Sequence, residues 1–464
     1  MVSMQDLIFI IVKDIREKIS KYEGKVIISL LFFFFAIYCY WGTLPKHFDF
    51  WGIIAPGNPL FSGISGINVY YSPIIGIFFR VWIDCGVIFF HLNLNNWIYY
   101  FSETFSEPRL IQDWCIIPFL LMLLFLIVVS YITLKNKWLT FLCFGTFSFV
   151  SIIILGQVDI WDCFWIYIAM ILALKSLESG NNLKFVFLSV LALGLSMQFK
   201  PFAGLIFPVF FVFFLKLLQE KPFPAWTKCM LLIYATLEFI FVSFISRIIW
   251  PHYISPSGGE AMWLFNFQFI SNPGVGDHTI LIWLLGYLLI LYDLWITFQG
   301  NNRDQLKISF IFYIFAVFAW FFISVYSFYM WWLILVPPLL LILDNFENKV
   351  NYVFYMAISG LFLLYALPEF PVTSILYYYM PVFNVSKLFV DIVATTIFAI
   401  LLLWIFELRK NILINQDDII PTQYTNSLRI IAPIFPAVLL ICLFILILIF
   451  GQPLLSIHSP PFFT

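Results

Sequence analysis

The chain has 464 residues, of which 63% are hydrophobic and only 11% are charged. A soluble protein is about 45–50% apolar and roughly 25% charged, so this composition excludes a soluble multidomain protein and makes lipid the main solvent. The net charge of −1 excludes the overall basic field that a nucleic-acid-binding protein needs. The seven cysteines include no CxxC pair, which predicts neither a zinc site nor a full disulfide framework. We expect no metal and no cofactor.

The predicted elements begin with a cytoplasmic segment, residues 1–25, which is rich in Lys and Arg and does not resemble a cleavable signal peptide. The first apolar stretch, residues 26–44, is long enough to cross a bilayer as a signal anchor. Twelve further candidate spans follow: 114–134, 138–155, 160–175, 185–199, 202–218, 229–249, 279–298, 308–325, 329–343, 350–367, 388–406 and 430–450. We therefore predict an all-α polytopic membrane protein with about 13 transmembrane helices.

Residues 69–92 are apolar but contain Arg80 and Asp84. If they crossed the membrane, every later loop would change sides. If they lie on the external or lumenal face, most of the 24 Lys and Arg residues fall on the cytoplasmic side, as the positive-inside rule requires. We therefore expect a large first external loop, residues 45–113, that contains interfacial helices.

Acidic residues lie at the predicted external ends of two sets of transmembrane spans. Asp49 follows the first span among aromatic residues, where it either caps a loop helix or acts as a general base. Gln157, Asp159 and Asp162 lie between two spans. Asp159 could cap the following helix, and Asp162 would share its face. Two carboxylates and an amide exceed what capping needs, and such groups near a membrane are usually retained for function.

Two cations stand on the side that the positive-inside rule disfavours. Lys200 ends one predicted helix, and Arg247 lies near the external end of another. Each either extends its charged end toward the interface or binds a phosphate. His252 follows soon after Arg247. Glu238, near the middle of its span, is predicted to have a buried partner or to relay protons.

A late aromatic turn, residues 324–332, includes Tyr329. Its aromatic side chains either form an interfacial belt or line a groove for a lipid chain or a sugar ring. The sequence contains no Walker A, HExxH or GxSxG motif, which disfavours an ATP-driven pump and a zinc intramembrane protease.

Several short motifs occur in a recognisable order: LFSG at 60–63, NVYYSP at 68–73, GQVD at 156–159 and FKP at 199–201, followed by the aromatic turn. This order resembles the polytopic GT-C glycosyltransferases. It is most similar to mannosyltransferase-like members, including the multispan GPI-mannosyltransferase-like proteins. The resemblance covers residues 26–343, which we expect to form the catalytic transmembrane module. The C-terminal helices, residues 344–464, carry little of it.

The resemblance implies a polyprenyl-phosphate sugar donor, with mannose the expected sugar. It also implies inverting transfer to a lipid or glycan acceptor on the non-cytoplasmic face. Asp49 matches the position of the base, Asp159 the Gln-x-Asp turn, and Lys200 the Lys-Pro turn. The residues fit this chemistry independently, since one carboxylate can accept the acceptor proton while cations stabilise the leaving phosphate. We assign substrate or phosphate binding to Gln157, Asp159, Asp162, Lys200, Arg247, His252 and Tyr329.

Two other functions remain open from the sequence. A lipid-linked glycan flippase or exporter predicts charges along a path through the bundle. A polysaccharide polymerase predicts a large, arginine-containing external loop in the second half, but residues 250–278 contain no arginine. For each function the expected location is a multi-pass protein of the plasma membrane in a prokaryote, or of the endoplasmic reticulum in a eukaryote. Membrane lipids are expected partners and nucleic acid is not.

Overall fold

The structure is a computed structural model. It describes residues 23–42, 73–90, 109–146, 159–178, 182–200, 202–249, 277–298, 303–324, 333–346, 349–366, 387–414, 434–436 and 438. Within these residues the regular secondary structure is helical and contains no β-strand. This result confirms the all-α prediction. The last predicted span, residues 430–450, lies mostly outside the described residues.

The described helices are α2 Glu23–Gly42, α4 Pro73–Phe90, α6 Arg109–Thr133, α7 Lys137–Phe144, α9 Asp159–Glu178, α10 Leu183–Ser196, α11 Phe202–Gln219, α12 Ala225–Ile249, α14 Asp277–Phe298, α15 Arg303–Ser324, α16 Val336–Asn345, α17 Lys349–Ala366 and α19 Lys387–Ile414. Each predicted span up to residues 388–406 overlaps one of them. In the described part of the chain, six stretches are long and apolar enough to cross a membrane: Trp114–Thr133, Asp159–Glu178, Phe202–Gln219, Ala225–Ile245, Gln305–Ile323 and Ile392–Lys410. The total of 13 spans stays a prediction.

Helix boundaries follow local capping chemistry. The side chain of Asn136 accepts a hydrogen bond from the amide of Trp138 and begins α7, and Asn182 caps α10 in the same way. The helix α16 begins only at Val336, although the predicted span starts at residue 329. Pro337 and Pro338 occupy its first turn, where a missing N–H costs little.

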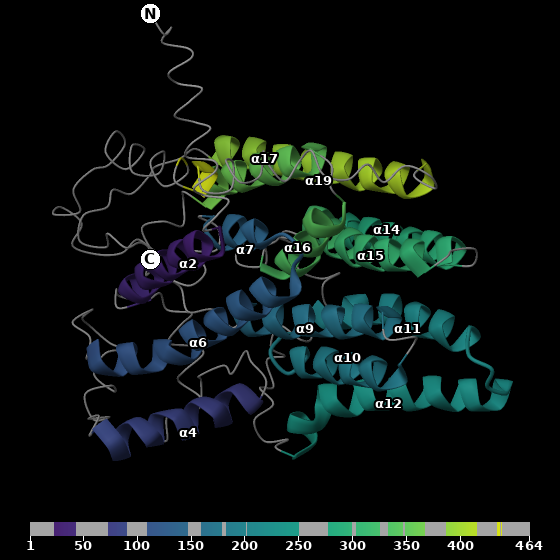
Figure 1. Ribbon diagram of the computed structural model, residues 1–464, viewed down its shortest axis with the longest axis horizontal. Helices are drawn as coiled ribbons and strands as arrows, with labels where there is room; N and C mark the ends of the chain where they lie inside the picture. Colours follow the sequence, from purple (N-terminus) through teal and green to yellow (C-terminus); the bar gives the residue numbers. More distant parts are fainter. Residues whose placement is uncertain are drawn as a thin grey trace, which may run out of the picture.

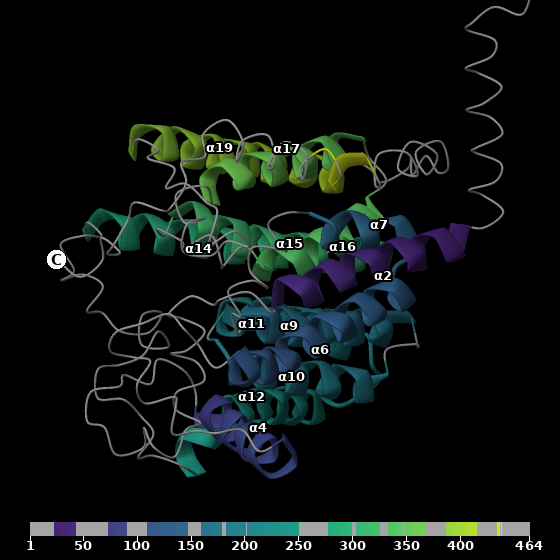
Figure 2. The same ribbon diagram turned by 90° about the vertical axis from the view of Figure 1, so that its left-hand side faces the viewer.

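The helices form stacked layers that keep the same order in two perpendicular views (Figures 1 and 2). The pair α17 and α19 forms one outer layer, and α14, α15 and α16 lie next to it. Then come α9 and α11, followed by α10 and α12, and α4 lies at the opposite side of the stack. The most extensive contact among the described helices is that of α9 with α10, which are consecutive and form an antiparallel hairpin.

Two glycines permit close helix contacts. A Cβ atom at Gly194 of α10 would lie 2.9 Å from Cβ of Val242 in α12. At Gly286 of α14 it would lie 2.1 Å from the ring of Trp320 in α15. Small residues at such contacts let helices approach closely, which drives helix association in membranes.

The turns that charge assigns to the cytoplasmic side meet in space. Asp344, at the end of α16, accepts hydrogen bonds from the backbone amides of Lys135 and Asn136 at 3.1 and 3.0 Å. Lys307 of α15 lies 3.4 Å from Glu178 at the end of α9. These contacts agree with the helix directions that we inferred from the positive-inside rule.

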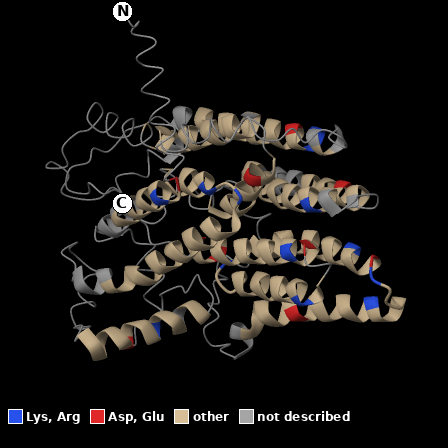
Figure 3. Ribbon diagram, in the orientation of Figure 1, with Lys and Arg blue, Asp and Glu red and all other residues tan. Residues whose placement is uncertain are grey.

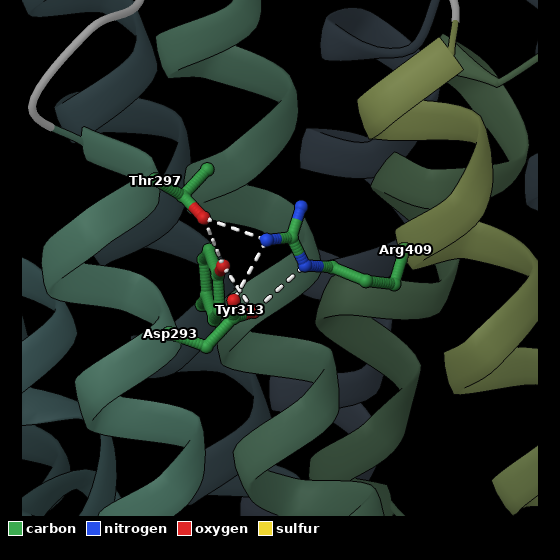
Figure 4. Close-up of polar contacts among 4 residues, drawn as sticks. All are labelled: Asp293, Thr297, Tyr313 and Arg409. Carbon is green, nitrogen blue, oxygen red and sulfur yellow. Dashed lines mark hydrogen bonds and ion pairs between the residues drawn. The ribbon is translucent and has the colours of Figure 1, made fainter.

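A polar network joins α14, α15 and α19 (Figure 4). Arg409 donates to both carboxylate oxygens of Asp293 at 2.7 Å and to the hydroxyl of Thr297 at 3.1 Å. The hydroxyl of Tyr313 donates to Asp293 at 2.7 Å. The helix α19 lies in the predicted C-terminal module, so this network ties that module to helices of the predicted catalytic module.

Candidate functional site

A buried ion pair joins the first turn of α9 to the residues that directly follow α10. The ammonium nitrogen of Lys200 lies 3.1 Å from Oδ1 of Asp159, and the two side chains are only 3% and 0% exposed. Removing either partner from a buried pair leaves an uncompensated charge and costs several kcal/mol, about 3–5. The pair therefore holds the start of α9 against the Lys-Pro turn.

Asp162 lies one turn further along α9 and is fully buried. One of its oxygens accepts a hydrogen bond from the hydroxyl of Ser196 in α10. The carbonyl of Ser196 accepts from the amides of Phe199 and Lys200, at 2.8 and 3.2 Å. Ser196 thus orients Asp162 with its side chain and the Lys200 turn with its main chain.

Aromatic side chains surround Trp161, which stands between the two aspartates in sequence. The ring centroid of Trp161 lies 4.8 Å from that of Phe78 in α4, 5.1 Å from Phe199 and 6.3 Å from Phe119 in α6. Three separate parts of the chain therefore fix the position of this indole. The aromatic contacts place α4 beside the acidic turn of α9.

The helix α4 packs against the first half of α6, on the side of the molecule where Trp161 lies. Phe79 stacks on Phe119 with centroids 5.6 Å apart, and Trp82 stacks on Trp114 near the start of α6. The charge pattern assigns this end to the external face, where we expect residues 69–92 to form an interfacial helix. The contacts are compatible with that position, and the depth of α4 relative to the bilayer stays a prediction.

The structure brings together three of the predicted site residues: Asp159, Asp162 and Lys200. Asp49, Gln157, His252 and Tyr329 lie outside the described residues. Arg247 belongs to α12, but its side chain is also outside the described part.

Sequence reasoning missed two members of this cluster, Ser196 and Trp161. Ser196 lies four residues before Lys200, so helical spacing places both on one face, and this signal could have found it. Trp161 lies between two predicted site residues, but in a chain this rich in aromatic residues its position alone does not mark it.

Charged residues are sparse along the described helices (Figure 3), so each buried one is informative. Glu238 of α12 is half-buried, and its Oε2 has no hydrogen-bond partner within the described part of the chain. Among the described residues, no group of three or more His, Cys, Asp or Glu side chains is arranged to hold a metal ion.

The cluster has defined chemical capabilities. Carboxylates such as those of Asp159 and Asp162 can accept hydrogen bonds, and the ammonium group of Lys200, whose nitrogen lies 3.1 Å from Oδ1 of Asp159, carries three N–H donors. The aromatic rings provide flat apolar surfaces beside them. No protein-family model and no curated protein matches this chain.

Proposed function

We propose that this protein is an integral-membrane inverting glycosyltransferase. It would move a sugar, with mannose as the first candidate, from a polyprenyl-phosphate carrier to a lipid or glycan acceptor on the non-cytoplasmic face. The observation that carries the proposal is the buried cluster of Asp159, Asp162 and Lys200 beside aromatic side chains. It stands at the helix ends opposite the Lys- and Arg-rich turns. The six long apolar helices support a membrane location.

The reaction requires one base and stabilisation of one leaving group. The Asp49 carboxylate takes the proton of the acceptor hydroxyl as its oxygen attacks the anomeric carbon. The bond between that carbon and the phosphate oxygen breaks, and polyprenyl phosphate leaves with the electron pair. Because a phosphate is already a good leaving group, the site needs no strong general acid.

The remaining residues bind the donor. The ammonium of Lys200, oriented by Asp159, binds the donor phosphate as a point charge. Arg247 adds a second cation that suits bidentate phosphate binding. Gln157, His252 and Tyr329 contribute polar groups and a ring for the sugar.

The decisive experiment compares the purified protein with an Asp49→Asn variant. Both receive polyprenyl-phosphate mannose, glucose or arabinose together with a lipid or glycan acceptor. The proposal expects transfer by the wild type and near-complete loss in the variant, whose amide cannot accept the proton at the required rate. Full activity of the variant would remove Asp49 as the base.

A flippase is the second candidate, and Glu238 is the observation that favours it. A half-buried carboxylate in the middle of an apolar helix is typical of a polar path through a membrane. Movement of a lipid-linked glycan in reconstituted vesicles, with no sugar transfer from any donor, would establish the flippase instead. A reporter at Ser257 that appears in the cytoplasm would contradict the orientation on which the transferase depends.

A further inference from the structure

Two adjacent residues in the first turn of α9 bury polar atoms for which the described part of the chain supplies no partner. Trp161 is 8% exposed and Asp162 is 0% exposed. Within the described part of the chain, Nε1 of Trp161 has no acceptor and Oδ2 of Asp162 has no donor. A buried group left without its hydrogen bond costs about 1–3 kcal/mol. The first turn of α9 therefore carries an unpaired donor and an unpaired acceptor that lower the stability of the fold.

The buried hydroxyls without partners in the described part of the chain have a simpler explanation. They belong to Ser130, Thr140, Ser243, Ser309 and Ser359. A hydroxyl in a helix can rotate to donate to a carbonyl one turn earlier, so these residues need no ligand. The Trp161 N–H is fixed in the plane of its ring, and Oδ2 of Asp162 cannot turn away without breaking the bond that Ser196 donates to Oδ1, so neither has this option.

Both side chains are held in place. The rings of Phe78, Phe119 and Phe199 surround the Trp161 indole. Ser196 holds the other oxygen of Asp162. Groups whose positions are fixed by their neighbours are pre-organised for a ligand, because binding then costs little side-chain entropy.

The unmet donor and acceptor define the class of ligand. A hydroxyl group accepts one hydrogen bond and donates another, so a polyol satisfies both atoms. A phosphate offers mainly acceptors and carries negative charge. Two carboxylates, Asp159 and Asp162, stand here against the single ammonium of Lys200, which disfavours an anion beside Asp162.

We infer that Trp161 Nε1 and Asp162 Oδ2 bind hydroxyl groups of the transferred sugar, with the indole donating and the carboxylate accepting. This inference rests on the proposed function for the identity of the donor. The cluster then has two parts with different roles. Lys200 faces the donor phosphate, and the Trp161–Asp162 pair recognises the sugar.

A binding experiment tests the inference without requiring catalysis. The thermal stability of the purified protein is measured with polyprenyl phosphate and with polyprenyl-phosphate mannose. The wild type is expected to gain more stability from the sugar-bearing lipid. Trp161→Phe and Asp162→Asn are each expected to lose that difference while keeping the gain from polyprenyl phosphate. Trp165→Phe is the matched control, because Trp165 lies four residues further along α9 and is expected to behave as the wild type.

A kinetic experiment sharpens the result. Trp161→Phe keeps an aromatic ring, although a smaller one, and loses the N–H, so KM for the donor is expected to rise about tenfold. The wild type is then tested with donors that each lack one sugar hydroxyl. For one of these donors, kcat/KM is expected to fall about tenfold relative to the full sugar. With Trp161→Phe the same donor is expected to cause no further fall, since the variant already lacks that hydrogen bond. Asp162→Asn is expected to remove the corresponding penalty for a different deoxy donor, the one that lacks the hydroxyl donating to Oδ2 of Asp162.

The outcomes separate this inference from the proposed function. If the wild type transfers sugar while both variants keep its KM and its sugar-dependent stabilisation, the inference is wrong and the transferase stands. If no donor supports transfer, yet the variants lose the sugar-dependent stabilisation, the transferase is wrong and sugar recognition stands. Absence of any sugar-dependent stabilisation in the wild type would overturn the inference directly.

Discussion

Trp82 and Trp114 exchange hydrogen bonds across the contact between α4 and α6. The indole of Trp82 donates to the carbonyl of Trp114 at 2.9 Å, and the indole of Trp114 donates to the carbonyl of Trp82 at 2.8 Å. The two rings also stack, with centroids 4.6 Å apart and planes 13° apart. This reciprocal contact fixes α4 where Phe78 meets Trp161, so it positions the aromatic side of the proposed sugar site.

Replacing Trp82 by Phe is expected to weaken the attachment of α4. The smaller phenyl ring can still stack on Trp114, but one hydrogen bond is lost, which costs about 1 kcal/mol. Limited proteolysis in detergent should then cleave around α4 faster than in the wild type. Val81→Ala is the control, because Val81 is an exposed side chain of the same helix. Equal cleavage rates in the two variants would show that the contact does not hold α4.

The Asp159–Lys200 pair allows structural and functional roles to be separated. Asp159→Asn or Lys200→Met alone leaves a buried charge without its counter-ion and is expected to destabilise the protein by about 3–5 kcal/mol. The double variant removes both charges and should recover most of the stability. Thermal unfolding in detergent measures this recovery.

Sugar transfer by the same double variant is the second measurement. If Lys200 binds the donor phosphate, the stable double variant is expected to remain inactive. Activity close to that of the wild type would mean that the pair serves only to join α9 to α10.

The Asp159–Lys200 contact was within reach of the sequence. The stretches on either side of residues 179–182 are of similar length, 159–178 and 183–200. At a constant rise per residue, an antiparallel hairpin brings their far ends level. The apolar runs predicted the helices themselves because each buried or lipid-facing turn demands apolar residues, whatever the tertiary arrangement.

The contact between Arg409 and Asp293 could not be predicted in this way. The two residues are 116 positions apart, and three described helices, α15, α16 and α17, lie between them in sequence. No local spacing rule relates helices that are joined through several others. Asp293 is a charge inside an apolar stretch, so the sequence indicates that it needs a partner without indicating which one.

Tyr313→Phe tests the network of α14, α15 and α19. The variant removes the hydroxyl that donates to Asp293 and lies 2.7 Å from the hydroxyl of Thr297, while Arg409 keeps both bonds to the carboxylate. We expect a loss of about 1 kcal/mol, measured by thermal unfolding. Tyr292→Phe is the control, since Tyr292 is an exposed residue next to Asp293. An equal effect of the two substitutions would contradict a stabilising role for the Tyr313 hydroxyl.

Gly286→Ala tests the close contact between α14 and α15. Alanine in a helix normally stabilises relative to glycine by roughly 0.5–1 kcal/mol. At Gly286, however, the new methyl carbon would stand 2.1 Å from the Trp320 ring, and a displaced indole must force the two helices apart. Overpacking of this kind costs about 1–3 kcal/mol, so a net destabilisation is expected.

Gly24→Ala is the matched control, because the nearest atom there, the hydroxyl oxygen of Tyr131, lies 3.7 Å away and only the helix preference acts. Opposite signs for the two substitutions in thermal unfolding would support the contact, whereas stabilisation by both would show that α14 and α15 do not approach each other at Gly286.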